Sequence, residues 1–118
     1  MCTVLFFVYI RGENMNIRTS FVAGRLTVYL SGELDHHEAR CTTRRIDDLL
    51  DEYLPRDCVL DLNGLSFMDS SGIAVIIRIS QRMKSLGGRV WIENPAKQPL
   101  RVIDASGVDR LVPVAINK

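Results

Sequence analysis

The order of strand-like and helix-like segments is the feature that most constrains the fold of this chain. Two runs in which apolar and polar residues alternate flank the turn signal Ala23-Gly24, and this pattern predicts a β-hairpin. The expected elements are strands at 17–22 and 25–30, a helix at 36–53, a strand at 58–62, a helix at 71–86, a strand at 89–93, a helix starting near 94–95 and a short strand at 110–114. This order predicts an α/β fold, with a mixed β-sheet that has parallel core strands and helices packed on it.

Local signals indicate where several of these elements end. Asp35 is a good N-cap for the first helix, Glu38 can complete a pair resembling a capping box, and Pro55 stops the helix. We expect residues 31–35 to interrupt the second strand. Pro99 removes a backbone donor, so the third helix either starts late or bends at this residue.

Composition and charge exclude several classes of protein. The 118 residues suit a single domain with one core. The formal net charge is +1 and like charges form no block, so we expect neither a nucleic-acid partner nor a membrane bound through charge. The 3 cysteines form no Cys-x-x-Cys pattern, and a reducing, cytoplasmic location suits them best.

The first 14 residues do not follow the pattern of the rest. The apolar run from Val4 to Ile10 is far shorter than the roughly 20 residues of a membrane span, and no signal-peptide features accompany it. Either Met15 is the true start and residues 1–14 come from a misassigned start codon, or they are an N-terminal extension that adds a strand or an apolar arm. We favour the first interpretation, because the domain at 15–118 is complete without them.

Catalytic patterns have little support. Ser70 or Ser71 would need a base such as His36 or His37, oriented by Asp35, but no spacing shows that these residues meet. Neither serine lies in a Gly-x-Ser-x-Gly motif, and the histidines lack the spacing of a metal site. No phosphate-binding glycine loop is present. We therefore expect no catalytic residue, no metal and no cofactor.

The serines lie where a strand pattern turns into a helix pattern, in Asp69-Ser70-Ser71-Gly72. One alternative is that a serine merely caps the helix. The other is that a hydroxyl at a helix N-terminus serves as an exposed site that tolerates a phosphate. The run from Ile73 to Ile77 is apolar on more than one helical face, which predicts either a partner-binding patch or burial under a neighbouring helix.

Two motifs resemble those of the anti-sigma factor antagonists of the STAS-domain family, including its sporulation regulators. They are Gly32-Glu33-Leu34-Asp35-His36-His37 and Leu65-Ser66-Phe67-Met68-Asp69-Ser70-Ser71-Gly72, within a likeness that covers about residues 16–114. The resemblance implies a STAS fold and a cytoplasmic phosphoprotein that regulates transcription and is not an enzyme. It implies that the unphosphorylated form binds an anti-sigma factor with GHKL-type serine kinase activity and thereby releases the sigma factor. Phosphorylation then inactivates the antagonist, and a PP2C-type phosphatase restores it.

Carried over by position, the resemblance implies that Ser70 is the phosphoacceptor. The segment Gly32–His36 would lie beside it and contact the kinase. The expected partner-binding residues are Gly32, Glu33, Leu34, Asp35, His36, Asp69, Ser71 and Gly72. Two alternatives remain: a STAS binding module that serves another signalling complex, or a small Ser/His hydrolase.

Overall fold

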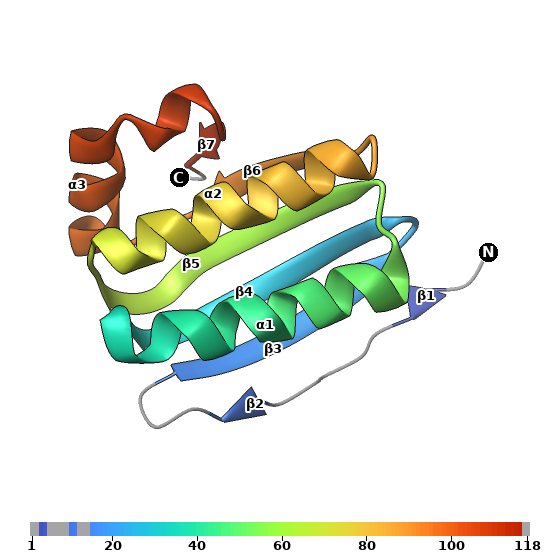
Figure 1. Cartoon of the computed structure of the whole chain (residues 1–118), viewed down its shortest axis with the longest axis horizontal. Coiled ribbons are helices and arrows are strands. Elements are labelled where there is room, and N and C mark those ends of the chain that lie inside the picture. The colour runs from blue at the N-terminus through green and yellow to red at the C-terminus, as the bar shows by residue number, and fades with distance from the viewer. Residues whose placement is uncertain (1–2, 5–9, 12–14, 117–118) are drawn as a thin grey trace.

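The computed structural model describes residues 3–4, 10–11 and 15–116. The elements are β1 (Thr3–Val4), β2 (Ile10–Arg11), β3 (Met15–Val22), β4 (Arg25–Leu34), α1 (His36–Tyr53), β5 (Asp57–Met68), α2 (Ser70–Ser85), β6 (Arg89–Glu93), α3 (Lys97–Ser106), a 3₁₀ turn (Val108–Arg110) and β7 (Val114–Ala115). Figure 1 shows α1 and α2 side by side across one face of the sheet, with α3 next to the start of α2.

The sheet is mixed, as predicted. β3 and β4 form the antiparallel hairpin, and Ala23 and Gly24 close it with positive φ angles of 51° and 81°. β4, β5, β6 and β7 then run parallel to one another. The strand order is β1-β3-β4-β5-β6-β7, with β2 also paired to β3. Because α1 and α2 connect successive parallel strands, the predicted α/β fold with parallel core strands is confirmed.

β4 and β5 are longer than the sequence indicated. The expected break at residues 31–35 is wrong, because β4 continues to Leu34 across two shifts in its register with β5. Gly32 lies at one of these shifts with a φ of 102°, a backbone conformation that favours glycine. β5 likewise continues past Leu62 to Met68. Both sequence motifs therefore lie partly on neighbouring strands and not in loops.

The ends of the helices follow from their caps. α1 spans the predicted residues, with the Asp35 carboxylate accepting a hydrogen bond of 3.0 Å from the Glu38 N–H. Leu54 ends α1 in the left-handed conformation. α3 starts at Lys97, so the late start is the correct one of the two alternatives for this helix. Pro99 thus falls in the first turn, where an N–H would have no helical partner, so the proline is accommodated.

The apolar excess of α2 contributes to the core. Ile73, Val75, Ile76 and Ile79 are buried, and Ile77 is partly buried against the same cluster. α2 contacts α1 on one side and α3 on the other. Burial under neighbouring helices is therefore the correct alternative for this run, and the patch alternative is wrong for most of it.

The chain after α3 differs from the prediction. The predicted last short strand is present as β7, but its bounds of 110–114 are wrong. Val108 to Val112 instead form a tight turn in which the Val112 N–H donates to the Val108 carbonyl at 2.9 Å. This turn buries both valines in the core. β7 is correspondingly short and pairs with β6 only at Ile92 and Glu93.

The N-terminal segment contributes two short strands. β1 and β2 each pair antiparallel with β3, over two residues apiece. The remaining residues of this segment lie outside the described part of the chain. Whether Met15 is the first residue in the cell stays a prediction.

Candidate functional site

The two motifs meet at the carboxyl ends of β4 and β5. In the parallel ladder Gly32 lies opposite Leu65, and Leu34 lies opposite Met68. The Ser66 hydroxyl donates a 3.0 Å hydrogen bond to the carbonyl of Gly32 and so ties the strands together. Both α1 and α2 begin immediately after these strands, so both helix N-termini lie at one end of the sheet (Figure 1). Such an end gathers free backbone N–H groups and favours negative charge.

Asp69 holds the two helix N-termini together. Its Oδ1 accepts a hydrogen bond of 2.8 Å from the Ser71 N–H, which makes Asp69 the N-cap of α2. Its Oδ2 accepts a second bond of 3.2 Å from the N–H of His36, in the first turn of α1. The alternative in which a serine caps the helix is therefore wrong. Sequence propensity could not settle this point, because Asp and Ser are about equally good caps.

Gly72 allows α2 to lie close to the end of β5. A Cβ at this position would overlap the side chain of Met68 and lie 3.3 Å from a methyl carbon of Leu34. Both neighbours are fully buried and have little room to move. The glycine of the motif is thus required by packing, and it fixes the height of the serines above the sheet.

Ser70 and Ser71 face different surroundings. Ser70 is exposed at the first position of α2 and borders a groove between α2 and α3, with a volume of about 420 Å³. Ser71 is half-buried and borders a separate groove of about 300 Å³ between α1 and α2, which His36 also lines. The groove beside Ser70 is lined by Ser70, Ile73, Arg101, Val102, Ala105 and Ser106.

Gln98 supports the site in a way the sequence did not indicate. Its side-chain amide makes two hydrogen bonds to the backbone of Met68: it accepts from the N–H at 2.8 Å and donates to the carbonyl at 2.9 Å. The last residue of β5 is thereby fixed to α3. Arg101, one turn further along α3, borders the Ser70 groove. No motif marked either residue, since their role depends on how α3 packs.

The other predicted residues divide by exposure. Glu33, His36 and His37 are exposed, whereas Leu34 is only 1% exposed and lies beneath the site. His36 and Ser71 share a groove, but within the described residues no hydrogen bond joins a histidine side chain to a serine. In residues 3–4, 10–11 and 15–116, no cluster of three or more potential metal ligands occurs. No helix among these residues is long and apolar enough to cross a membrane.

Comparison with known proteins gives consistent matches over most of the chain. The family model of the STAS domain matches residues 15–117. An anti-sigma F factor antagonist from Paenibacillus polymyxa is 32% identical over 105 residues, which is 89% of this chain and 90% of the relative.

Two solved structures have the same fold. The anti-sigma factor antagonist SpoIIAA in its unphosphorylated form has a TM-score of 0.72 and 25% identity, covering 84% of this chain and 87% of that chain. The phosphorylated form of the Bacillus cell fate determinant SpoIIAA has a TM-score of 0.64 and the same identity, covering 84% and 90%.

Proposed function

Because this chain belongs to the STAS-domain family and, within it, to the anti-sigma factor antagonists, we propose that it regulates transcription by phosphorylation-dependent partner switching. Anti-sigma factor antagonists are regulatory proteins without enzymatic activity. In the proposed cycle the unphosphorylated protein binds an anti-sigma factor in the cytoplasm and releases the sigma factor. The anti-sigma factor, acting as a GHKL-type serine kinase, phosphorylates Ser70, and a PP2C-type phosphatase removes the phosphate.

We choose Ser70 as the phosphorylation site because its side chain is exposed and the preceding residue, Asp69, already caps the helix. Asp69 satisfies the Ser71 N–H, so the Ser70 hydroxyl is not needed for capping. Within the described part of the chain, this hydroxyl makes no hydrogen bond. The Ser66 hydroxyl, by contrast, is bonded to Gly32. The Ser66 hydroxyl is already bonded and Ser71 is half-buried, so Ser70 is the serine of the motif that combines an exposed side chain with an unbonded hydroxyl.

The domain can accommodate a phosphate at this position. Phosphoserine carries about −1.5 to −2 charge at neutral pH, and the positive end of the α2 dipole favours negative charge there. Arg101 borders the same groove and adds a cation from α3. Asp69 adds an opposing negative charge, but its two N–H donors neutralise it in part. Phosphorylation thus alters the surface seen by a partner and leaves the fold intact.

The partner surface in this proposal combines the ends of both motifs. Glu33, Asp35 and His36 lie on one side of Asp69, and Ser70 with the α2–α3 groove lies on the other. A partner that covers this end of the sheet would place apolar side chains in the groove beside Ser70. A phosphate there introduces bulk and a charge that must be desolvated, so the complex dissociates.

The test is phosphorylation and binding with candidate anti-sigma kinases. The purified protein is incubated with each kinase and ATP, and the phosphate is located by mass spectrometry. We expect modification of Ser70, none in Ser70→Ala, and normal modification in the matched control Ser85→Ala, at the far end of α2. Affinity measured by calorimetry should fall on phosphorylation, and sigma factor should be released only by the unmodified protein. Phosphate found on Ser71, or an affinity for the anti-sigma factor that phosphorylation of Ser70 does not change, contradicts the proposal.

A further inference from the structure

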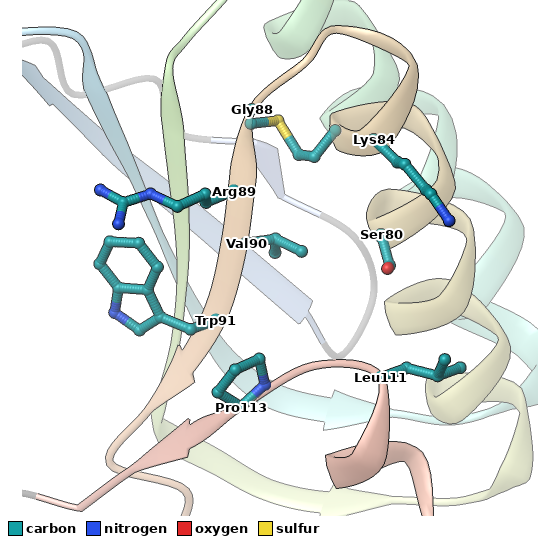
Figure 2. Close-up of a pocket in the computed structure, with 9 residues that line it drawn as sticks. Ser80, Lys84, Gly88, Arg89, Val90, Trp91, Leu111 and Pro113 are labelled. Atoms are coloured by element: carbon teal, nitrogen blue, oxygen red, sulfur yellow. The ribbon is translucent and has the colours of Figure 1, made fainter.

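A cavity lies at the opposite end of α2 from Ser70. It has a volume of about 650 Å³, within the range of about 300 to 1,000 Å³ typical of small-molecule sites. Its walls come from the last turns of α2, the free edge of β6 and the segment before β7 (Figure 2). The lining residues are Ser80, Met83, Lys84, Gly88, Arg89, Val90, Trp91, Leu111 and Pro113.

The interior of this cavity is mainly apolar. Figure 2 shows Val90 directed toward α2 in the space between strand and helix, with Leu111 and Pro113 closing the lower side. Met83 is fully buried beneath it. Leu111 is 65% exposed, although it is a large apolar side chain. An exposed leucine at the mouth of an apolar cavity is expected to bury area when a ligand fills the space.

In the part of the chain that the structure describes, two polar side chains of the cavity, those of Ser80 and Lys84, are hydrogen-bond donors without partners, whereas Arg89 is bonded to Asp57. Ser80 and Lys84 lie four residues apart, on one face of α2. Within the described residues, neither side chain makes a hydrogen bond or an ion pair. Two donors, one of them a cation, match a ligand that brings acceptor oxygens and negative charge.

The edge of β6 supplies a third donor. Arg89 donates its N–H toward the β5 side, to the Arg56 carbonyl at 3.0 Å, whereas Ile92 donates in the opposite direction, to Pro113 at 2.8 Å. Since amides alternate in direction along a strand, the Val90 N–H points to the same side as that of Ile92. β7 begins its pairing only at Ile92, so no strand lies opposite Val90.

We propose that this cavity binds an amphipathic carboxylate, with its head at Ser80 and Lys84 and its apolar body against Val90 and Leu111. The complementarity of donors to an anionic head, together with apolar walls, favours this class over an uncharged ligand. It also favours this class over an added peptide strand, because only a short stretch of the β6 edge is free. The site is independent of the proposed switch, since it lies at the far end of α2.

Calorimetry provides the direct measurement, because Figure 2 shows the indole of Trp91, the only tryptophan of the chain, on the opposite side of β6 from Val90. The full-length, unphosphorylated protein is titrated with decanoate, and the titration gives both affinity and stoichiometry. We expect saturable binding of one decanoate. Decanol, which has the same chain length without the charge, should bind at least about tenfold more weakly. Equal binding of the two, or no saturation below about 10 mM, overturns the proposal.

Variants then test the position of the head group. Lys84→Met keeps the length of an exposed side chain and should weaken decanoate binding about tenfold, whereas Lys97→Met on α3 should leave it unchanged. Leu111→Glu should abolish binding, because its carboxylate repels the carboxylate of decanoate, whereas Leu111→Lys should retain binding. Both variants should fold, because position 111 is largely exposed and either charge can stay in solvent. An unchanged affinity in Lys84→Met contradicts the assigned head-group position.

The alternative ligand, a peptide strand added to the edge of β6, is tested by amide NMR. An acetylated pentapeptide of alternating valine and glutamate is added in place of decanoate. We expect no shifts of the Gly88 to Trp91 amides. If the peptide shifts these amides and decanoate does not, the edge of β6 accepts a strand and the carboxylate proposal is wrong.

Discussion

The Asp69 carboxylate accepts a hydrogen bond from the backbone N–H of His36, at 3.2 Å, while its other oxygen caps α2 through Ser71. One side chain thereby joins the first turns of two helices that are separated by a complete strand in the sequence. The contact couples the second motif to the first, because His36 closes the segment that begins at Gly32. Asp69 thus adds a direct bond between the two helix N-termini to the β4–β5 ladder that already brings them together.

Replacing Asp69 should therefore reduce stability by more than an ordinary surface substitution. Asp69→Ala removes both acceptors and should lower the free energy of unfolding by about 2 kcal/mol, the upper end for a lost N-cap. Asp69→Asn keeps one acceptor oxygen and should cost about 0.5 kcal/mol. Urea unfolding measures both, with Asp48→Ala on the exposed face of α1 as the control. Equal losses for Asp69→Ala and Asp48→Ala would show that the bridge contributes nothing.

Gly72 should be intolerant of alanine even though it lies in a helix. In an exposed helical position, Gly→Ala usually stabilises by about 0.5 to 1 kcal/mol. Here the added methyl group overlaps Met68 and approaches Leu34, so we expect Gly72→Ala to destabilise by about 1 to 3 kcal/mol.

A double-mutant cycle in thermal or urea unfolding separates this packing effect from helix propensity. Met68→Ala alone leaves a cavity, but in the Gly72→Ala background the new methyl group fills part of that space. The loss caused by Met68→Ala should therefore be smaller in that background. Strict additivity of the two substitutions contradicts the overlap.

The sequence predicted the architecture well because the pattern of strands and helices is local. The hairpin, the span of α1, β6 and the order of elements follow from periodicity and caps such as Asp35. The extension of β4 to Leu34 was missed, because a ladder that resumes past Gly32 depends on its partner strand and not on the segment itself.

The candidate site was predictable only in part, because several of its contacts join segments that are distant in the sequence. The motifs located the serines, but capping propensity is equal for Asp and Ser, so only the structure shows that Asp69 is the cap. The bidentate bond from Gln98 to Met68 and the Arg101 side of the Ser70 groove are contacts between distant segments. No local pattern encodes such contacts, since they arise when α3 packs beside α2.

Asp57 should make stability depend on pH. Its side chain is 2% exposed and bonds Arg89 at 3.1 Å and Arg25 at 3.4 Å. Burial alone would raise the pKa of Asp57, but the hydrogen bonds and charges of Arg89 and Arg25 outweigh burial and hold its pKa below the usual 3.8. A lowered folded-state pKa means that this contribution is present at neutral pH and is lost as the pH falls below about 4.

The comparison of wild type with Asp57→Asn isolates this contribution. At pH 7 the variant should be less stable by about 1 kcal/mol, a modest value because both arginines are largely exposed. The difference should shrink as the pH is lowered from about 5 to 3. Urea unfolding at several pH values measures this difference in stability. Urea is used because guanidinium, as a salt, would screen the ion pairs. A difference that is constant with pH would falsify the assignment.

Removal of residues 1–14 should leave the domain folded. β1 and β2 pair with β3 over two residues each, whereas the β3–β4 ladder runs the full length of β3. We expect the melting temperature of the 15–118 chain to fall by less than about 5 °C, equivalent to about 1 kcal/mol. Circular dichroism should retain the spectrum of the full chain. A fall several times larger shows that the N-terminal segment belongs to the folded core.

An acidic residue at position 70 should weaken binding to the anti-sigma factor without affecting the fold. Ser70 is exposed at the positive end of α2, so Ser70→Asp should keep or slightly raise the melting temperature. A carboxylate has less charge and bulk than a phosphate, so its effect on affinity should be smaller than that of phosphorylation, at about tenfold. The control Gln81→Asp places the same charge on an exposed position of the same helix, remote from the site, and should leave affinity unchanged. Calorimetric affinities that fall equally in both variants indicate a general charge effect and argue against a local switch at Ser70.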